Sequence, residues 1–523
     1  MADSSLLTAV VFAPALGALL LTLFPSRDHN NVKATALGIS TAVFLLSTGL
    51  WLGFDPTQTD YQFAVNVPWV EPLGIGYRIG IDGISLVLIV LTTFLCPITL
   101  LGAWSAIQHR VKEFAICMLV LECGMLGAFV ALDLFLFYVF WEAMLIPMYF
   151  IIGIWGGKRR VFAAVKFFVF TMAGSLLMLI AILVVAIRPE GWDFSLMGAL
   201  QQSQPLATQR LLFWAFALAF AVKVPMFPVH TWLPDAHVEA PTPGSVILAG
   251  VLLKLGVYGF IRFAFPMFPR AAFEALPILG GLAVAGIIYG ALVAWVQADM
   301  KKLVAYSSVS HLGFCMLGLA AMTTEGVSGA LFVCIAHGVS TGALFMLVGV
   351  LYERRHTRIM ADYGGIARQV PVFALFLVMT AMASAGLPLL SGFPGEFLVL
   401  LGTFTADGPL ARSWAILGAT GVILAAVYIL WMAQRILFGP MTNPANDKLE
   451  DMNPREIFSV ACLMGASFVL GVAPNLVLDK LRLPVEEWVR TVHVRSGQGA
   501  YAPDEGVFSK VQPKDGAPGK AAH

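Results

Sequence analysis

The chain has 523 residues, of which 59% are hydrophobic and 12% are charged, and its formal net charge is +1. A soluble globular protein carries about 25% charged residues, so this composition indicates a multi-pass protein of a lipid bilayer. A net charge this close to zero gives no support for a nucleic-acid partner. The six cysteines stand apart in apolar segments without CxxC or Cys/His spacing, so neither structural zinc nor iron–sulfur clusters are expected.

Apolar runs of a length that crosses a bilayer, about 20 residues, predict an all-α membrane protein with about 14 transmembrane helices. The runs are continuously apolar, whereas membrane strands alternate. The first run lacks a basic leader and a cleavage site, so it is predicted to be a span and not a signal peptide. In chain order the predicted spans are 6–24, 33–52, 83–104, 114–132, 134–155, 161–187, 211–229, 245–264, 275–296, 303–321, 327–351, 371–401, 413–437 and 456–478.

Lysine and arginine are unequally divided between the two sets of alternate loops. One set holds roughly 16 of them, including the run 158–160, and the other holds about six. The positive-inside rule places the richer set in the cytoplasm and both termini on the periplasmic side. Because a targeting segment is lacking, we expect the inner membrane of a bacterium. The polar tail 479–523 is expected to be disordered after Arg495.

Two spans contain helix-breaking residues near their middle. Proline removes a backbone donor and clashes with the preceding turn, so the seventh and twelfth spans are predicted to be discontinuous. They lie five spans apart and therefore cross the membrane in opposite directions. Matching breaks of this kind predict two inverted five-helix repeats, spans 4–8 and 9–13, with an ion site between them. The predicted breaks are at Pro225, Pro228, Pro388 and Pro394.

These repeats divide the chain into five segments. The predicted divisions are 1–104 for the first three helices, 114–264 for the first repeat, 275–437 for the second repeat, 456–478 for the last span and 479–523 for the polar tail.

Ionisable side chains recur inside the predicted spans. A charge at the bilayer centre costs about 2.5–3.5 kcal/mol on insertion scales, so such residues are expected to face a hydrated bundle interior. Glu142 and Lys223 have opposite signs in one repeat and are predicted to pair. Burial favours a neutral lysine, whereas pairing favours a charged one, so Lys223 could exchange a proton near neutral pH, as histidine does. The candidate proton-translocating residues are Glu142, Lys223, Lys254, His311, His337 and Glu396.

Each candidate also has a structural interpretation. Glu142 and Lys254 could form fixed ion pairs, and His311 and His337 could be core histidines satisfied by nearby hydroxyls. After the first break, His230, Asp235 and His237 could form a proton entrance, or this stretch could be a proline-rich turn in which Asp235 caps a helix.

Several stretches resemble the antiporter-like subunits of respiratory complex I (NADH:quinone oxidoreductase) and of Mrp cation/proton antiporters. The resemblance is carried by FYVFWEAMLIPMYFIIGIWG, FAVKVPMFPVHTWLPDAHVEAPTPGSVILAG, KKLVAYSSVSHLGF, IAHGVSTGALFMLVGVLYERRHTR and GFPGEFLVL. It implies that Glu142, Lys223, Lys254 and Glu396 form a proton-translocating axis, on which His311 and His337 also fall. A glutamate in the twelfth span is typical of one complex I branch, whereas other branches carry lysine there.

The resemblance also implies what the chain lacks and what surrounds it. No cofactor is expected in this chain, and FMN, iron–sulfur clusters and quinone are expected in partner subunits. The expected partners are the other complex I membrane subunits, above all neighbouring antiporter-like subunits, together with lipid and protons. The alternatives are an Mrp-type cation/proton antiporter subunit and a structural membrane spacer.

Overall fold

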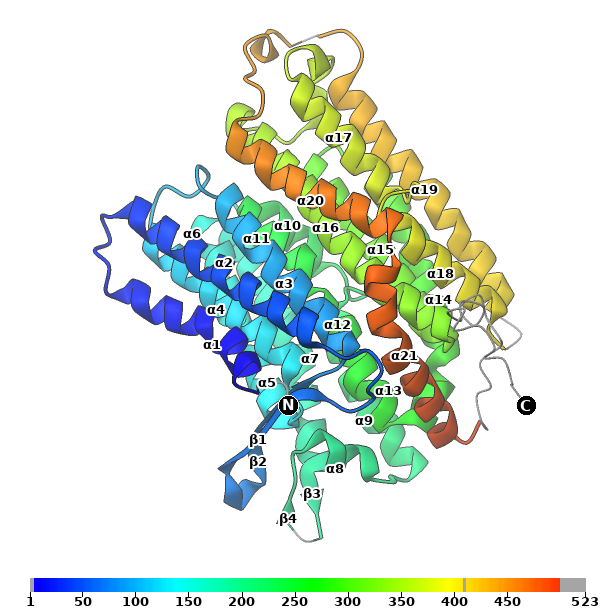
Figure 1. The fold of residues 1–523 in the computed structure, drawn as a ribbon. Coiled ribbons are helices and arrows are strands. Elements are labelled where there is room, and N and C mark those ends of the chain that lie inside the picture. The colour runs from blue at the N-terminus through cyan, green and yellow to red at the C-terminus, as the bar shows by residue number, and fades with distance from the viewer. Residues whose placement is uncertain (1–3, 190, 408–410, 442, 499–523) are drawn as a thin grey trace, which may run out of the picture.

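The computed structural model describes residues 4–189, 191–407, 411–441 and 443–498, which form a bundle of long helices (Figure 1). Thirteen helical segments in these residues are long and apolar enough to cross a membrane. A further crossing is made by two shorter helices, Pro371–Ser384 and Gly392–Thr405. These crossings confirm an all-α membrane fold with about 14 spans.

The helices are named as in Figure 1. The first ten are α1 Ser4–Thr22, α2 His29–Gly53, α3 Gly83–Gly102, α4 Val111–Val130, α5 Leu134–Ala143, α6 Leu145–Trp155, α7 Arg160–Ala186, α8 Leu196–Gln201, α9 Leu206–Lys223 and α10 Trp232–Glu239. The rest are α11 Thr242–Ile247, α12 Lys254–Gly259, α13 Phe265–Met267, α14 Pro269–Trp295, α15 Met300–Ala321, α16 Thr324–Arg355, α17 Pro371–Ser384, α18 Gly392–Thr405, α19 Ala411–Leu437, α20 Pro454–Val472 and α21 Asn475–Ser496.

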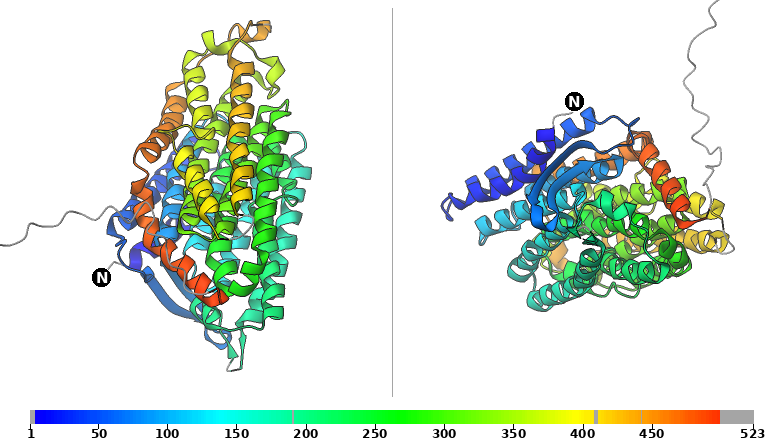
Figure 2. Two further views of the ribbon diagram at one scale, coloured as in Figure 1. Left: turned by 90° about the vertical axis from the view of Figure 1, so that its right-hand side faces the viewer. Right: turned by 90° about the horizontal axis from the view of Figure 1, so that it is seen from below.

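Two short antiparallel hairpins, which were not predicted, lie in loops at one end of the bundle. They are β1 Gln62–Val70 with β2 Ile75–Ile81, and β3 Ile187–Arg188 with β4 Gly191–Trp192. Seen from below, the longer hairpin curves across the end of the bundle (Figure 2). We call this the hairpin end, and the end where α15 begins the opposite end. At the hairpin end, Asp133 accepts from the backbone of Phe135 and Leu136 and pairs with Arg78 at 2.6 Å, which fixes the start of α5.

The predicted break in the seventh span lies between α9 and α10. Pro225 has no N–H to give to the carbonyl of Ala221, and Met226 N–H donates to that carbonyl instead at 2.9 Å. The carbonyl of Val222 accepts from the indole of Trp232 at 2.9 Å. The backbone groups freed by the break are therefore satisfied inside protein, as a bilayer requires.

The twelfth span is interrupted between α17 and α18. Gly386 has a φ of 72°, a conformation that favours glycine and commonly ends a helix. Leu387 N–H then donates to the carbonyl of Met382 at 3.1 Å. Pro388 lies in the gap, but the prediction for Pro394 is wrong, because this residue lies in the first turn of α18. A missing N–H is tolerated in a first turn, where amides have no partner within the helix.

The eighth span is irregular, which sequence reasoning did not anticipate. It consists of α11, α12 and α13 separated by two π-helical segments, Leu248–Leu252 and Phe260–Ala264. Its most apolar stretch is completely buried, as is that of α16. Such π segments often occur at functional sites, and Lys254 lies two residues after the first one ends.

The C-terminal region corrects a prediction. Residues 479–496 were assigned to a polar tail, but α21 is a 22-residue helix lying against the bundle. Its apolar face is buried, and its polar groups bind carbonyls of other elements: Lys480 donates to Phe54 at 3.0 Å and Trp488 to Ile261 at 2.6 Å. The predicted disorder after Arg495 concerns mainly residues 499–523, which lie outside the described residues.

Replacement of Gly83 by alanine is expected to destabilise the packing of α21 against α3. A methyl group on Gly83 would lie 1.8 Å from the carbonyl oxygen of Lys480, so α3 and α21 would have to separate. Overpacking of this kind costs about 1–3 kcal/mol, measurable as a lower thermal unfolding midpoint in detergent. Gly281→Ala is the matched control, because nothing lies within 4 Å of the added methyl group. Equal midpoints for the two variants would contradict the close contact.

Candidate functional site

A continuous run of polar side chains lies inside the bundle between α12 and α18. The ammonium of Lys254 donates to Nδ1 of His337 at 2.7 Å and to the carbonyl of Ala249. The rings of His337 and His311 are 5.7 Å apart between centroids. Nδ1 of His311 lies 3.2 Å from Oε1 of Glu396. All four residues are at most 5% exposed. The structure therefore brings together four of the six predicted residues, from four different helices.

His311 connects several of these groups at once. Its Nε2 lies 3.1 Å from the hydroxyl of Tyr428 and 3.4 Å from that of Ser384. With its proton on Nδ1, the ring donates to Glu396 and accepts from Tyr428. A second proton would turn Nε2 into a donor, whose hydrogen bond the hydroxyl oxygens of Tyr428 and Ser384 can accept. This ring can therefore gain and lose a proton without losing all its partners.

Lys223 is buried at the end of α9, but it does not pair directly with Glu142 as predicted. Its ammonium lies 5.1 Å from the ring centroid of Trp141 and 5.9 Å from that of Phe167. Among the described residues, neither this ammonium nor Oε1 of Glu142 has a hydrogen-bond partner. Each still has the other as a charged neighbour. The aromatic face of Trp141 takes the place predicted for the carboxylate, since a cation is attracted to such a face.

Glu142 lies at the edge of the bundle, not in its interior. Its side chain is partly exposed on the surface of this chain, beside Ser175. Glu142 is near the end of α5, and its span is interrupted at Met144, between α5 and α6, where Pro147 removes a backbone hydrogen bond. Its Oε1 atom is covered by protein, whereas other atoms of the residue reach the surface of the bundle.

The three predicted entrance residues are not gathered in one place. Asp235 pairs with Lys166 at 2.6 Å in a partly exposed position. His237, two residues later on α10, is fully buried and stacks on Phe345 with centroids 4.6 Å apart. The ring of His230 packs against that of Tyr289, with centroids 5.3 Å apart. Helical residues two apart point in different directions, which explains why Asp235 and His237 separate.

His237 lies between the polar run and the opposite end. Its charged neighbours are Lys254 on one side and Lys301 on the other, and neither ring nitrogen has a hydrogen-bond partner among the described residues. Lys301 donates to the carbonyl of Ala240 at 2.5 Å. Both Lys301 and Ala240 line a cavity of about 360 Å³ at the opposite end, together with Glu239 and Glu353.

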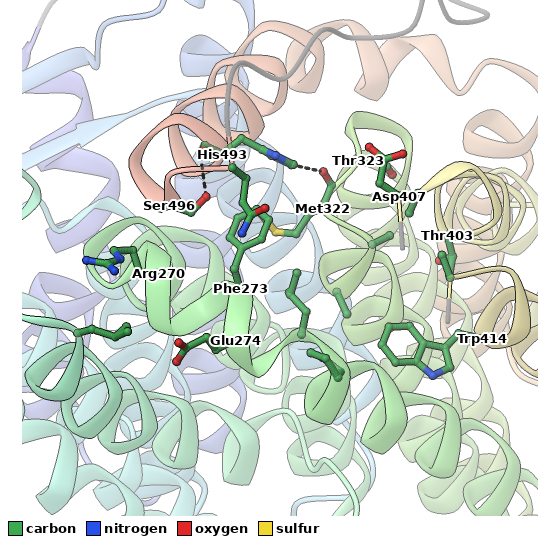
Figure 3. A pocket seen from close by; sticks show the side chains of 18 residues that line it. Arg270, Phe273, Glu274, Met322, Thr323, Thr403, Asp407, Trp414, His493 and Ser496 are labelled. Carbon is green, nitrogen blue, oxygen red and sulfur yellow. Dashed lines mark hydrogen bonds between the residues drawn. The ribbon is translucent and has the colours of Figure 1, made fainter. Parts of the chain in front are cut away.

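A second cavity, of about 700 Å³, lies at the hairpin end between α14, α15, α18, α19 and α21. Figure 3 shows Arg270, Glu274, Trp414 and His493 around it, with His493 bonded to the carbonyl of Met322 at 3.1 Å. None of the six candidate residues lines this cavity. Nor do three or more His, Cys, Asp or Glu side chains gather as possible metal ligands in the described part of the chain.

Comparison with known sequences decides the family. The profile described as "NADH:quinone oxidoreductase/Mrp antiporter, TM" matches residues 131–432, more than half of the chain. The chain belongs to this family. All six candidate residues lie inside the matched region, whereas the buried Glu122 lies outside it.

Relatives within the NADH:quinone oxidoreductase/Mrp antiporter family point to one branch. NADH-quinone oxidoreductase subunit M of Rhodobacter capsulatus is 45% identical over 517 residues, covering 95% of this chain and 99% of the relative. NADH-ubiquinone oxidoreductase chain 4 of Arabidopsis thaliana is 40% identical over 485 residues, covering 92% and 97%. These relatives confirm the predicted complex I branch, which the glutamate at position 396 indicated.

Solved structures of this family agree with the fold. In respiratory complex I from Thermus thermophilus with bound NADH, one chain matches with a TM-score of 0.85 and 33% identity, covering 93% of this chain and 99% of that one. A chain of the Mrp complex from Dietzia sp. matches with a TM-score of 0.76 and 24% identity, covering 97% and 53%. The second likeness shows the shared fold alone.

Sequence reasoning missed several polar contacts of the site. Tyr428 is a single tyrosine in an apolar helix, and its contacts with His311 and Ser307 distinguish it from an apolar core residue. Ser384 gave no signal beyond its place before the break. Glu122, whose place was left open, accepts from the hydroxyl of Ser40 at 3.0 and 3.2 Å between α4 and α2, away from the candidate residues.

Proposed function

We propose that this chain is a membrane-arm subunit of a complex I-type NADH:quinone oxidoreductase and translocates protons without a redox centre of its own. The run Lys254–His337–His311–Glu396 carries the proposal, because its members can exchange protons, its outer steps are contacts of 2.7 and 3.2 Å, and its two histidine rings are 5.7 Å apart between centroids. The curated relatives that bear complex I names support the assembly. FMN, iron–sulfur clusters and quinone then belong to partner subunits.

The two broken spans support the proposed inverted repeats. The α9 break contains bonds from Val224 to Phe220 and from Met226 to Ala221. The α17 break contains bonds of the same spacing, from Ala385 to Ala381 and from Leu387 to Met382. α9 enters from the hairpin end and α17 from the opposite end, so the two breaks approach the bilayer centre from opposite sides. We propose the repeats as 114–264 and 275–437.

We place the opposite end in the cytoplasm and both termini on the periplasmic side of a bacterial inner membrane. The basic loop residues gather at the opposite end, as the positive-inside rule requires. Protons then enter at the cavity beside Lys301 and reach the run past His237. Asp235, tied to Lys166, and His230 lie off this path.

Lys223 and Glu142 extend the proposed path toward an adjacent subunit. Glu142 is partly exposed at the edge of the bundle. A charge in the adjacent subunit would act on Glu142, which in turn would change the proton affinity of Lys223. A change in the proton affinity of Lys223 can supply the energy that moving a proton requires. Moving one charge against 100 mV requires about 2.3 kcal/mol, and a change of one pKa unit corresponds to about 1.36 kcal/mol. A change of about two units in proton affinity is therefore sufficient.

Lys254→Met is expected to lower NADH-driven proton translocation severalfold, because it removes the ammonium that joins the run to Ala249 and His337. The measurement is the quenching of a pH-sensitive dye in inverted vesicles whose only copy of this chain is the variant. Lys112→Met is the control, since Lys112 donates to the carbonyls of Thr22 and Phe24, away from the run. Replacing sodium by potassium should leave the signal unchanged. A signal that requires sodium would favour the cation/proton antiporter function instead.

A further inference from the structure

Two cysteines are in sulfur–sulfur contact at the centre of the bundle. Sγ of Cys315 on α15 lies 3.6 Å from Sγ of Cys334 on α16, and both side chains are buried. Both are free thiols. A disulfide requires a separation of about 2.05 Å, so the sulfurs need to approach by about 1.5 Å. None of the other four cysteines, all within the described residues, has a second sulfur as a hydrogen-bond partner.

The thiol pair lies one helical turn from the histidine pair. Cys315 follows His311 by four residues, and Cys334 precedes His337 by three, so each cysteine shares a helix face with its histidine. Both thiols also have the ammonium of Lys254 as a charged neighbour.

We propose that Cys315 and Cys334 are an oxidisable dithiol that forms a disulfide between α15 and α16. The oxidant is a small neutral peroxide, the class of oxidant that needs the least space to reach a buried thiol pair. The thiolate attacks hydrogen peroxide, breaks its O–O bond and becomes a sulfenic acid with release of water. The second thiol then displaces the sulfenic oxygen as another water, forming the S–S bond. In total two thiols lose two electrons and two protons, and one peroxide becomes two waters.

The disulfide would act as a clamp on the histidine step. It ties α15 to α16 within one turn of the ring pair, so His311 and His337 can no longer change their separation freely. This consequence depends on the proposed proton path, whereas formation of the disulfide does not. We expect oxidation to lower NADH-driven proton translocation and dithiothreitol to restore it.

Thiol counting in the intact complex tests the dithiol directly. Membranes are treated with hydrogen peroxide, denatured and alkylated with iodoacetamide, and the chain is weighed by mass spectrometry. The reduced chain has six free cysteines, so loss of one pair leaves four alkylated thiols. Dithiothreitol before alkylation should return the count to six. Six alkylated thiols after peroxide, or oxidised sulfurs without a cross-link, would refute the dithiol.

Two single variants separate this pair from general oxidation. Cys315→Ala should keep five alkylated thiols with and without peroxide, whereas Cys96→Ala, at another buried cysteine, should fall from five to three. Equal losses in both variants would overturn the assignment. A disulfide that forms while proton translocation stays constant would overturn the clamp and leave the dithiol standing. Whether this chain translocates protons at all is tested separately, by dye quenching in Lys254→Met vesicles that have not been treated with peroxide.

Discussion

Lys223→Met is expected to lower NADH-driven proton translocation about tenfold or more, since a positioned proton-transfer group typically contributes 10²–10⁴-fold. The ammonium ends α9 next to the backbone break and is 1% exposed. It faces the rings of Trp141 and Phe167 and has Glu142 as a charged neighbour. Methionine has a similar length and no charge, so the bundle can remain packed while the exchangeable proton is lost. Dye quenching in inverted vesicles measures the effect.

Lys223→Arg separates the loss of charge from the loss of proton exchange. Arginine keeps the positive charge but is not deprotonated in proteins, so it should be as defective as methionine. Lys33→Met is the matched control in a membrane helix, because Lys33 binds the carbonyl of Trp104 away from the polar run. The amount of assembled complex, read by immunoblot, identifies variants that fail to fold. An active arginine variant would show that Lys223 acts as a fixed charge.

The sequence predicted which residues matter better than how they contact each other. Lys223, Lys254 and Glu396 stood out because ionisable groups are rare in apolar spans, and the structure buries all three. The pairing of Glu142 with Lys223 was wrong because charge signs do not specify directions. The side chain next to Glu142 in sequence, Trp141, faces the ammonium instead.

Partners that carry no charge were beyond sequence reasoning. Tyr428 and Ser384 reach His311 only because α19 and α17 converge on α15, a property of the packing. By contrast, α21 could have been found. Its buried residues Val477, Leu481, Val485, Trp488 and Val492 recur every three or four positions, the period of an amphipathic helix. The high polarity of the same stretch concealed this pattern.

Glu396→Gln is expected to lower proton translocation about tenfold or more, because the amide has nearly the shape of the carboxylate but cannot accept a proton. Glu396 is 5% exposed, and its Oε1 lies 3.2 Å from Nδ1 of His311. Without the anion, an imidazolium at His311 loses its counter-charge inside the bilayer, a loss that tyrosine and serine hydroxyls cannot replace. The protonated ring therefore becomes costly, and transfer through the run slows at this step.

Glu122→Gln is the control that makes this result specific. Glu122 is as deeply buried as Glu396, but its hydroxyl partner Ser40 places it among α2, α3 and α4, outside the matched family region. If burial of any carboxyl group were enough, both variants would lose translocation equally. We expect the Glu122 variant to retain nearly all of it. Glu396→Asp should recover part of the rate. It restores a carboxyl group, but its side chain is one methylene shorter and so lies farther from His311. Full activity in Glu396→Gln would remove Glu396 from the proton path and leave His311 as its last described member.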